Sequence, residues 1–310
     1  MHTTDYLIAG SSHAALEAIN AIRMHDGDGS ITVVTRDPHR PYSPTVLPYV
    51  VSGRSTPERV FLRDDDFFTA NKVDYRSGCA LAGLDPAAHQ ARLADGSTIG
   101  YRKLLLATGA SPIGLDVPGA KELAGYGLGY SIATHAHLLA GKSVAVVGST
   151  IRALRGVAEL ARTATQVYLV APDARSLETP FARALRRYQN VELLGGAKVE
   201  QISGDQSVEQ LVVTQEGRRL RLNVDAAFVD LGLRPNSDLV SKIAQTTQDG
   251  FIWIDDRNAT TVPGLFAAGD VTTSFGEQIL IAIGEGARAA LSAYDYLLAW
   301  LPVHLDNPAD

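Results

Sequence analysis

The sequence predicts an α/β protein made of two Rossmann-like, three-layer nucleotide-binding domains. The first observation behind this fold class is a strand–helix–strand pattern at residues 6–35, which contains "YLIAG", "HAALEAINAIRMH" and "SITVVT". The second is the return of that pattern at residues 142–172, with "KSVAVVG", "IRALRGVAELART" and "QVYLVAP". Such units favour a parallel sheet covered by helices, and two of them far apart along the chain indicate two domains.

Size and composition agree with this and exclude several functions. The chain has 310 residues, 45% hydrophobic and 20% charged, with a net charge of −6 that argues against nucleic-acid binding. No stretch approaches the ~20 apolar residues of a membrane span, and the first residues lack the cationic start of a signal peptide. Cys79 is the one cysteine, so an internal disulfide is excluded. We expect a cytoplasmic protein with no nucleic-acid partner and no membrane span.

Strand-like and helix-like segments alternate along most of the chain. Short apolar runs bounded by turn residues predict strands, and apolar residues at helical spacing predict helices. Helices are expected at residues 13–25, 151–163 and 276–301. Strands are expected at residues 6–10, 30–35, 80–85, 90–95, 103–109, 142–148, 166–172, 198–205, 208–217, 218–232 and 262–270.

The first turn approximates the dinucleotide-binding pattern G-x-G-x-x-G/A with the letters GSSHAA at residues 10–15. Gly10 makes the tight turn, and Ala15 keeps helix and strand close together. Ser12 replaces the glycine that lets the backbone approach a diphosphate, but it is small and its hydroxyl can donate. The N–H groups and positive dipole end of the helix favour an anion. Taken alone, the turn is equally compatible with a plain α/β connection.

Polar residues follow three further strands, at the end where parallel sheets bind ligands. Thr35 stands where a ribose-binding acid is usual, and Thr35 or Arg36 can bond a ribose hydroxyl or a phosphate. A polar loop is the alternative for both. Thr108-Gly109 ends another strand, and Gly269-Asp270 ends the last one. Asp270 is placed there to accept a hydrogen bond from a ligand hydroxyl.

Four motifs in this order resemble the flavoproteins with two dinucleotide-binding domains: "GSSHAA", "YRKLLLATGASP", "VAVVGSTIRALRG" and "VPGLFAAGDVTT". These flavoproteins are the pyridine nucleotide–disulfide oxidoreductases and their ferredoxin-reductase and thioredoxin-reductase relatives. The resemblance extends from Asp5 to Leu298. The stretch "HRPYSPTVLPYVVSGR" is similar to ferredoxin-reductase and nitrite-reductase flavin domains, and the C-terminal stretch to thioredoxin reductase and the alkyl hydroperoxide reductase flavoprotein.

This resemblance implies FAD, bound in a discontinuous domain at residues 1–111 and 229–310. It implies an NAD(P)-type domain at residues 112–228 and, as in thioredoxin reductase, no C-terminal interface domain. The FAD-binding residues that it implies are Gly10, Ser12, His13, Ala15, Thr35, Arg36, Ser43, Leu81, Thr108, Gly109, Gly269, Asp270 and Gln278.

The resemblance also implies roles for these residues. The GSSHAA turn would meet the pyrophosphate, Leu81 would contact the adenine through its backbone, and Asp270 would bind the ribitol or the pyrophosphate. Gln278, at the start of the last helix, would aim N–H groups at the flavin pyrimidine, where a reduced flavin carries negative charge. The residues nearest the flavin would be Tyr42, Ser43 and Tyr49. No side chain is assigned as a catalytic acid or base.

Two departures from the family pattern bear on function. The redox cysteine pair is missing, and His135 and His137, which stand in that region, can neither exchange thiols nor form a metal site alone. In the second turn, Thr150 replaces the close-approach glycine, and Ala171 replaces the acid that would bind an NAD ribose. Arg155 also replaces the usual helix glutamate. The nicotinamide site is therefore expected to be eroded, and the residues left to bind NAD(P) are Gly148, Thr150 and Ala153.

Three functions remain open at this point. The first is an FAD-dependent NAD(P)H oxidoreductase that passes electrons to a small molecule or an acceptor protein. The second is an FAD dehydrogenase subunit that oxidises an organic, amine-type substrate within a complex without NAD(P)H, by resemblance to the flavoproteins of opine oxidase and hydrogen cyanide synthase. The third is a non-catalytic FAD- or nucleotide-binding protein. An oligomer, with partner subunits in the second case, is expected.

Overall fold

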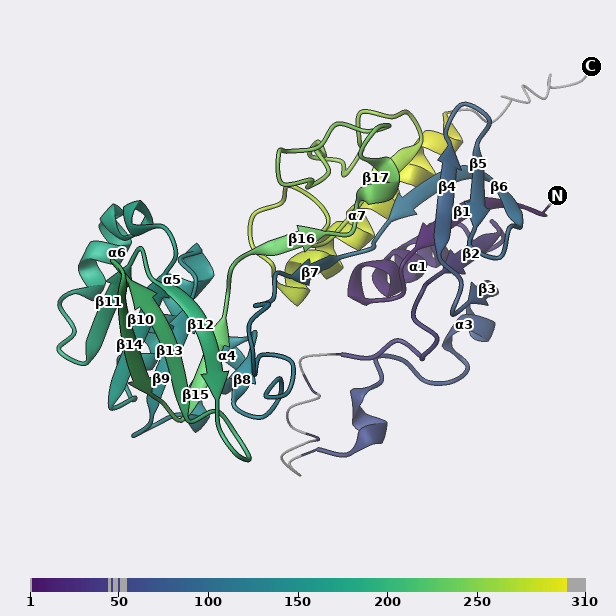
Figure 1. Ribbon diagram of the computed structural model, residues 1–310. Helices are drawn as coiled ribbons and strands as arrows, with labels where there is room; N and C mark the ends of the chain where they lie inside the picture. The colour runs from purple at the N-terminus through teal and green to yellow at the C-terminus, as the bar shows by residue number, and fades with distance from the viewer. Residues whose placement is uncertain (1, 44–45, 47–49, 51–54, 300–310) are drawn as a thin grey trace, which may run out of the picture. The chain divides into compact units, whose positions relative to one another are not determined.

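The computed structural model describes residues 2–43, 46, 50 and 55–299 (Figure 1). The chain forms two compact units. Unit 1 comprises Met1–Ser111 and Arg234–Asp310, and unit 2 comprises Pro112–Leu233. Both contain parallel sheets with helices packed on them, which confirms the predicted α/β fold class. Which nucleotide each unit binds stays a prediction.

Unit 1 is built on a seven-stranded sheet with the order β3-β2-β1-β6-β5-β4, and β17 also pairs with β6. In register, Ala9 of β1 lies level with Val34 of β2 and Leu106 of β6, so these parallel strands end at one edge. β4 and β5 form an antiparallel hairpin beside β6. The strands are β1 (His2–Ala9), β2 (Ile31–Val34), β3 (Val73–Arg76), β4 (Leu81–Asp85), β5 (Gln90–Leu93), β6 (Thr98–Leu106) and β17 (Leu265–Ala267).

Two helices, α1 (His13–His25) and α7 (Ile279–Leu298), pack against each other over one face of this sheet (Figure 1). Their close approach depends on Gly286, because a Cβ there would lie 2.0 Å from the Ala14 carbonyl oxygen. The last helix begins later than the predicted residue 276, since Gly276 has a φ of +92°. The shorter helices of unit 1 are η2 (Pro57–Val60), α3 (Phe67–Ala70) and η5 (Asp238–Val240).

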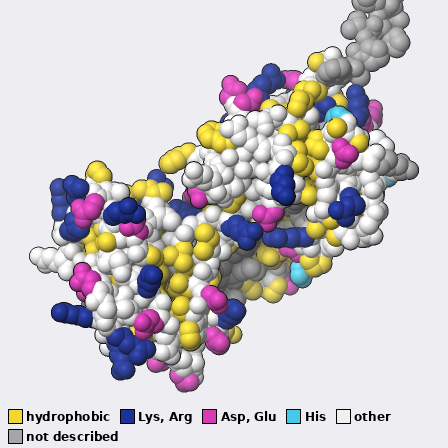
Figure 2. Space-filling model, turned by 45° about the horizontal axis from the view of Figure 1, so that its top comes forward, with side chains coloured by type: hydrophobic (Ala, Val, Ile, Leu, Met, Phe, Trp, Pro, Cys, Tyr) yellow, Lys and Arg dark blue, Asp and Glu magenta, His cyan; other side chains and the backbone are white. Residues whose placement is uncertain are grey.

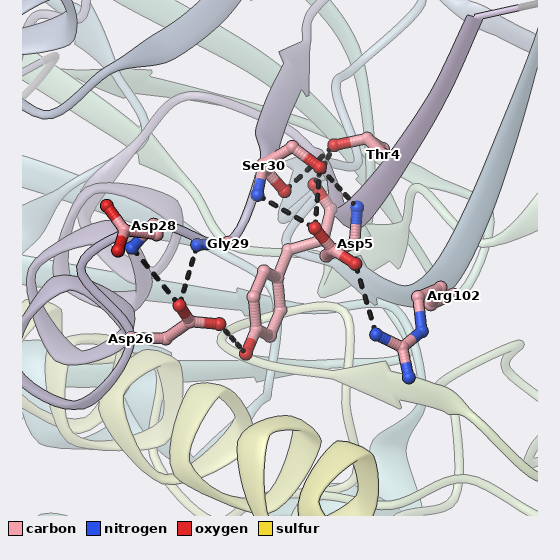
Figure 3. Close-up of polar contacts among 8 residues, drawn as sticks. Thr4, Asp5, Asp26, Asp28, Gly29, Ser30 and Arg102 are labelled. Atoms are coloured by element: carbon pink, nitrogen blue, oxygen red, sulfur yellow. Dashed lines mark hydrogen bonds and ion pairs between the residues drawn. The ribbon is translucent and has the colours of Figure 1, made fainter. Parts of the chain in front are cut away.

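Polar contacts pin the opposite edge of the sheet, where β1 begins (Figure 3). The Asp5 carboxylate accepts hydrogen bonds from the Ser30 N–H and hydroxyl at 2.9 and 2.7 Å, and it pairs with Arg102 at 3.2 Å. The Tyr6 hydroxyl donates to Asp26 at 2.9 Å. These bonds hold the loop between α1 and β2, far along the strands from the edge that carries the GSSHAA turn.

Unit 2 repeats the plan with a five-stranded parallel sheet in the order β11-β10-β9-β15-β8. The helix after β9 is α5 (Ile151–Leu160), which ends earlier than predicted. The predicted strand 218–232 is in fact two strands, β14 and β15, which belong to different sheets. The sheet strands are β8 (Leu128–Gly129), β9 (Ser143–Val147), β10 (Gln166–Ala171), β11 (Val191–Gly195) and β15 (Ala226–Val229).

The two faces of this sheet are covered by different layers. Helix α5 packs on one face, where Leu154 and Val157 bury against Val146 and Leu169. A three-stranded antiparallel sheet covers the other face. The remaining elements are β12 (Lys198–Ser203), β13 (Gln210–Gln215), β14 (Arg218–Asn223), α4 (Ile132–His135), η3 (Ala136–Leu138), η4 (Ala174–Glu178) and α6 (Pro180–Leu185), with β7 (Ala110–Pro112) pairing β16 (Leu233–Pro235) where the chain passes between units.

Surface charge and helix composition bear on the predictions of no nucleic-acid partner and no membrane span. Figure 2 shows acidic and basic side chains interspersed on the visible face, without a large area of one sign. Within residues 2–43, 46, 50 and 55–299, no helix combines the length and apolar character needed to span a bilayer.

Candidate functional site

The turn after β1 is formed by a glycine that no other residue can replace without strain. Gly10 has a φ of +113°, and its N–H donates to the Val34 carbonyl at 2.8 Å. A Cβ at Gly10 would lie 2.1 Å from the Ala107 carbonyl oxygen. The turn can therefore lie against the end of β6, which brings the start of α1 to the carboxyl edge of the sheet.

The N-terminus of α1 is open toward this edge. Ser12 is the N-cap residue with extended backbone, yet its side chain does not cap the helix, and its Oγ lies 3.2 Å from the His13 Nδ1. Burial, with a contribution from Arg63, lowers the pKa of His13. Uncapped N–H groups at the positive end of a helix favour a phosphate group, so the local geometry suits a diphosphate.

Two hollows lie along the carboxyl edge of unit 1, one on each side of this turn. The first has a volume of about 380 Å³ and includes the predicted residues Gly10, Ser12, Thr35, Arg36, Leu81 and Thr108 in its lining. The second, of about 210 Å³, includes Ser12, His13, Gly109, Gly269, Asp270 and Gln278. Because Ser12 and Ala107 line both hollows, together they offer one elongated site with the helix start at its middle.

Two predicted residues lie outside the lining of these hollows. Ala15 is fully buried within the core beneath the turn. Ser43 is 5% exposed, and its N–H donates to the Val60 carbonyl at 2.8 Å. Tyr42 pairs with Phe61 through the backbone, whereas Tyr49 falls outside the described residues.

The residues at the end of β2 divide into a structural one and an exposed one. The Thr35 Oγ1 accepts the Asp37 N–H at 3.3 Å, and the Thr35 N–H donates to the Arg76 carbonyl at 3.1 Å, so Thr35 shapes its own loop. Arg36 is exposed at the rim of the first hollow. Arg36 is therefore the better placed of the two for a phosphate.

Asn236 is a site residue that the sequence reasoning missed. Its side chain donates to the Thr108 carbonyl at 2.8 Å, while the Thr108 hydroxyl donates to the Asn236 carbonyl at 2.8 Å. The Ser111 hydroxyl donates to the Asn236 Oδ1 at 3.1 Å. Asn236 also lines the first hollow and holds the end of β6 in place. The Pro235-Asn236 pair at the end of the short strand β16 was the available signal.

Glu285 is a second missed residue, and it lies inside α7. It is 4% exposed, and its carboxylate accepts the Gly269 N–H at 2.7 Å and the Thr272 hydroxyl at 3.3 Å. A charged residue on the buried face of an apolar helix was the signal for it. Gln278 is the N-cap residue of α7.

The turn of unit 2 has the same backbone but a different helix start. Gly148 has a φ of +128°, and a Cβ there would lie 1.9 Å from the Asp230 carbonyl oxygen. Unlike Ser12, Thr150 does cap its helix, because its Oγ1 accepts the Ala153 N–H at 3.0 Å. Arg155 is exposed and Ala171 is buried. One donor of this turn is therefore already used by the protein.

The histidines of the region that would hold a redox cysteine pair do not gather into a metal site. The His135 Nδ1 lies 2.9 Å from the Ser131 carbonyl oxygen. In the part of the chain that the structure describes, no three His, Cys, Asp or Glu side chains could jointly hold a metal ion.

Comparison with known proteins gives a family and several relatives. The model of the family described as pyridine nucleotide-disulphide oxidoreductase matches residues 4–286. The chain is 42% identical over 275 residues to subunit epsilon of NADH-dependent phenylglyoxylate dehydrogenase from Aromatoleum evansii, which covers 86% of this chain and 64% of that protein. It is also 34% identical over 210 residues to NADH dehydrogenase from Bacillus subtilis (strain 168), and this match covers 66% of this chain and 41% of that protein. The chain spans less than two thirds of the length of either relative.

Solved structures share the fold at low identity. Thioredoxin reductase from Giardia duodenalis superposes with a TM-score of 0.78 at 21% identity, covering 96% of this chain and 100% of that chain. Putidaredoxin reductase, in a covalent complex with putidaredoxin, gives 0.68 at 23% identity, covering 94% and 75%. At this identity the likeness concerns the fold alone.

Proposed function

Because the chain belongs to the pyridine nucleotide–disulphide oxidoreductase family, whose members bind FAD and use NADH or NADPH, we propose that it transfers a hydride between NAD(P)H and FAD and passes the electrons to an acceptor. The observation that carries the proposal is the elongated site at the carboxyl edge of unit 1. An FAD molecule has two bulky ends joined by a diphosphate, which matches two hollows joined at a helix N-terminus.

The residues present fit this cofactor at each part of the site. Gly10 and the open start of α1 would bind the diphosphate, and Asp270, three residues after β17, would accept hydrogen bonds from ribitol hydroxyls. Gln278 would direct the first turn of α7 toward the flavin ring. Bound FAD supplies the redox chemistry itself, while these residues bind and orient it.

The route of the electrons beyond the flavin would differ from that of the disulfide-using relatives. Cys79 is the one cysteine in the chain, so no dithiol pair within it can relay electrons. The acceptor would therefore take electrons directly from the flavin. A relative at 42% identity is a subunit of an NADH-dependent dehydrogenase, which supports a proposal that the acceptor or donor is a partner subunit.

One observation favours a second function. In unit 2 the Ala153 N–H already donates a hydrogen bond to the Thr150 hydroxyl. The second turn therefore has fewer free N–H donors for a nucleotide than the first. An FAD subunit that is reduced by an organic, amine-type substrate, and not by NAD(P)H, would agree with that geometry. A non-catalytic FAD-binding protein would agree with it as well.

Anaerobic stopped-flow spectroscopy separates these functions. The purified protein is first examined for a flavin spectrum, and is then mixed with NADH or NADPH while flavin absorbance is recorded. Rapid bleaching by either nucleotide is expected under the main proposal. Normal FAD content without bleaching would refute it and leave the other two, which a panel of amine substrates then distinguishes. Absence of flavin after reconstitution with FAD would contradict the first two and leave, of the third, only a protein that binds another nucleotide.

A further inference from the structure

The two nucleotide-type turns can be compared position by position, because each begins with a glycine packed against the end of a neighbouring strand. A Cβ at Gly10 would meet the Ala107 carbonyl oxygen at 2.1 Å, and a Cβ at Gly148 would meet that of Asp230 at 1.9 Å. Ala107 and Asp230 each donate an N–H, at 2.8 Å, to the last residue of the central strand. Asp230 in unit 2 is therefore the counterpart of Ala107 in unit 1.

The same comparison pairs Arg152 with Ala14, since each lies four residues after its turn glycine. In unit 1 the two small side chains, Ala14 and Ala107, line the hollow of about 210 Å³. In unit 2 the corresponding side chains form an ion pair: the Arg152 Nε lies 3.1 Å from one Asp230 oxygen, and Nη2 lies 2.8 Å from the other. Space that is open in unit 1 thus holds two charged groups in unit 2.

The position of this ion pair in the sheet points to a ligand site. The chain runs from β9 to β10 and β11 on one side, while β15 lies on the other side of β9. Arg152 belongs to the helix that follows β9, and Asp230 directly follows β15. Ligands of open α/β sheets bind at such a switch point, outside the carboxyl ends of the strands. The Arg152 side chain is 28% exposed and the Asp230 side chain 8% exposed, so the pair is largely buried but a ligand can still reach the arginine.

We propose that Arg152 is a binding residue for the diphosphate of a nicotinamide dinucleotide and that Asp230 holds it until the ligand replaces the carboxylate. This rests on the proposed function. A guanidinium presents the same two parallel donors to a phosphate as to a carboxylate, so the exchange keeps Arg152 paired. The added cation compensates for the N–H that Thr150 removes from the turn. Asp230 loses its partner in the exchange, which weakens nucleotide binding.

Titration calorimetry with ADP-ribose and AMP tests this on the FAD-loaded protein. ADP-ribose carries the diphosphate and AMP does not, so only the affinity for ADP-ribose should depend on Arg152. We expect Arg152→Ala to weaken ADP-ribose roughly tenfold, which is the scale of one charge-assisted contact, and Asp230→Asn to tighten it several-fold. AMP affinity should change little in either variant.

Removing Arg152 alone leaves a buried carboxylate unpaired, and this can destabilise unit 2. The double variant Arg152→Ala/Asp230→Asn removes both charges and should still bind ADP-ribose weakly. Lys142→Ala is the matched control, because Lys142 pairs with Asp225 at 3.1 Å at the other end of β9. ADP-ribose affinity in this control should equal that of the wild type.

Unchanged or tighter ADP-ribose binding in the double variant would overturn the inference, as would an absence of ADP-ribose binding in both the wild type and Asp230→Asn. The outcome is separable from that of the proposed function. If NADH fails to bleach the flavin although ADP-ribose binds through Arg152, the proposed function fails and the inference stands. If NADH bleaches the flavin of the double variant at the wild-type rate and half-saturation, the inference fails alone.

Discussion

Glu285 accepts the backbone N–H of Gly269 at 2.7 Å, so a carboxylate inside α7 holds the residue that precedes Asp270. The same carboxylate accepts hydrogen bonds from the hydroxyls of Thr272 and Ser274. Burial raises the pKa of Glu285, while the hydrogen bonds from Gly269 and Thr272 act in the opposite direction. The loop proposed to meet the flavin is therefore shaped by a residue that lies behind it.

Replacing Glu285 should loosen this loop and reduce FAD retention. Glu285→Ala leaves the Gly269 N–H and the Ser274 hydroxyl without this acceptor, whereas the Thr272 hydroxyl keeps the Gly269 carbonyl at 2.8 Å. The free energy of unfolding should therefore fall by about 2 kcal/mol. Urea unfolding and the FAD-to-protein ratio after gel filtration measure the two effects. Asp295→Asn, on the exposed side of α7, is the control and should retain FAD. Full FAD content in Glu285→Ala would show that the loop holds its shape without the carboxylate.

Two glycines of α7 should respond oppositely to alanine. A Cβ at Gly286 would lie 2.0 Å from the Ala14 carbonyl oxygen, so Gly286→Ala must push α7 away from α1 and should destabilise the protein by about 1–3 kcal/mol. At Gly284 nothing lies within 4 Å, so Gly284→Ala should stabilise the helix by about 0.5–1 kcal/mol. Thermal unfolding of both variants gives the comparison. Equal effects of the same sign would contradict the close helix contact.

Thr150→Gly should raise the affinity for NADH and lower the free energy of unfolding. The substitution frees the Ala153 N–H and removes a β-branched side chain from the turn, so NADH should bind more tightly if unit 2 holds that nucleotide. Because glycine is itself tolerated at an N-cap, loss of the Thr150 cap should lower the free energy of unfolding by only about 0.3 kcal/mol.

The control for Thr150→Gly is Thr179→Gly, which removes the equivalent cap of α6, where the Thr179 Oγ1 accepts the Ala182 N–H at 3.3 Å. It should lower stability to a similar extent without changing NADH affinity. Calorimetric NADH titration and urea unfolding of both variants decide the matter. No change in NADH affinity in Thr150→Gly would make the second turn a scaffold only.

The Asp5 network should make stability depend on pH in acid. Burial favours a higher pKa for Asp5, but hydrogen bonds from Ser30 and the contact with Arg102 bring it below the ordinary 3.8. A carboxyl with a lowered folded pKa stabilises the protein above its unfolded pKa and loses that contribution as pH falls through the folded value.

We therefore expect Asp5→Asn to destabilise the protein by about 1 kcal/mol at pH 7, allowing for partial exposure. The difference from wild type should shrink as the pH falls below about 4. Urea unfolding at several pH values measures it. Asp28→Asn, at a side chain that is 100% exposed, is the control and should have little effect at any pH. A difference that grows in acid would reverse the assigned sign.

The elements that local chemistry determines could be predicted from the sequence. Hydrophobic periodicity located both βαβ units, and a positive φ explains Gly10 and Gly148. Asn236 and Glu285 could not be found in this way, because their partners lie 128 and 16 residues away and only the folded chain brings them together. Replacement of the close-approach glycine by Thr150 was visible in the sequence, but its capping bond to the Ala153 N–H depends on the backbone conformation at the start of α5.

The paired turns have a consequence for how this protein can change over generations. At Gly10 and Gly148 a Cβ atom would collide with a backbone carbonyl, so a substitution there would destabilise the fold whatever its effect on a ligand. Arg152 and Asp230 stand at neighbouring positions that alter what the crevice admits while the frame around them is kept. If both units bind nucleotides as proposed, substitutions at Arg152 and Asp230 would change the preference of unit 2 while unit 1 keeps its own.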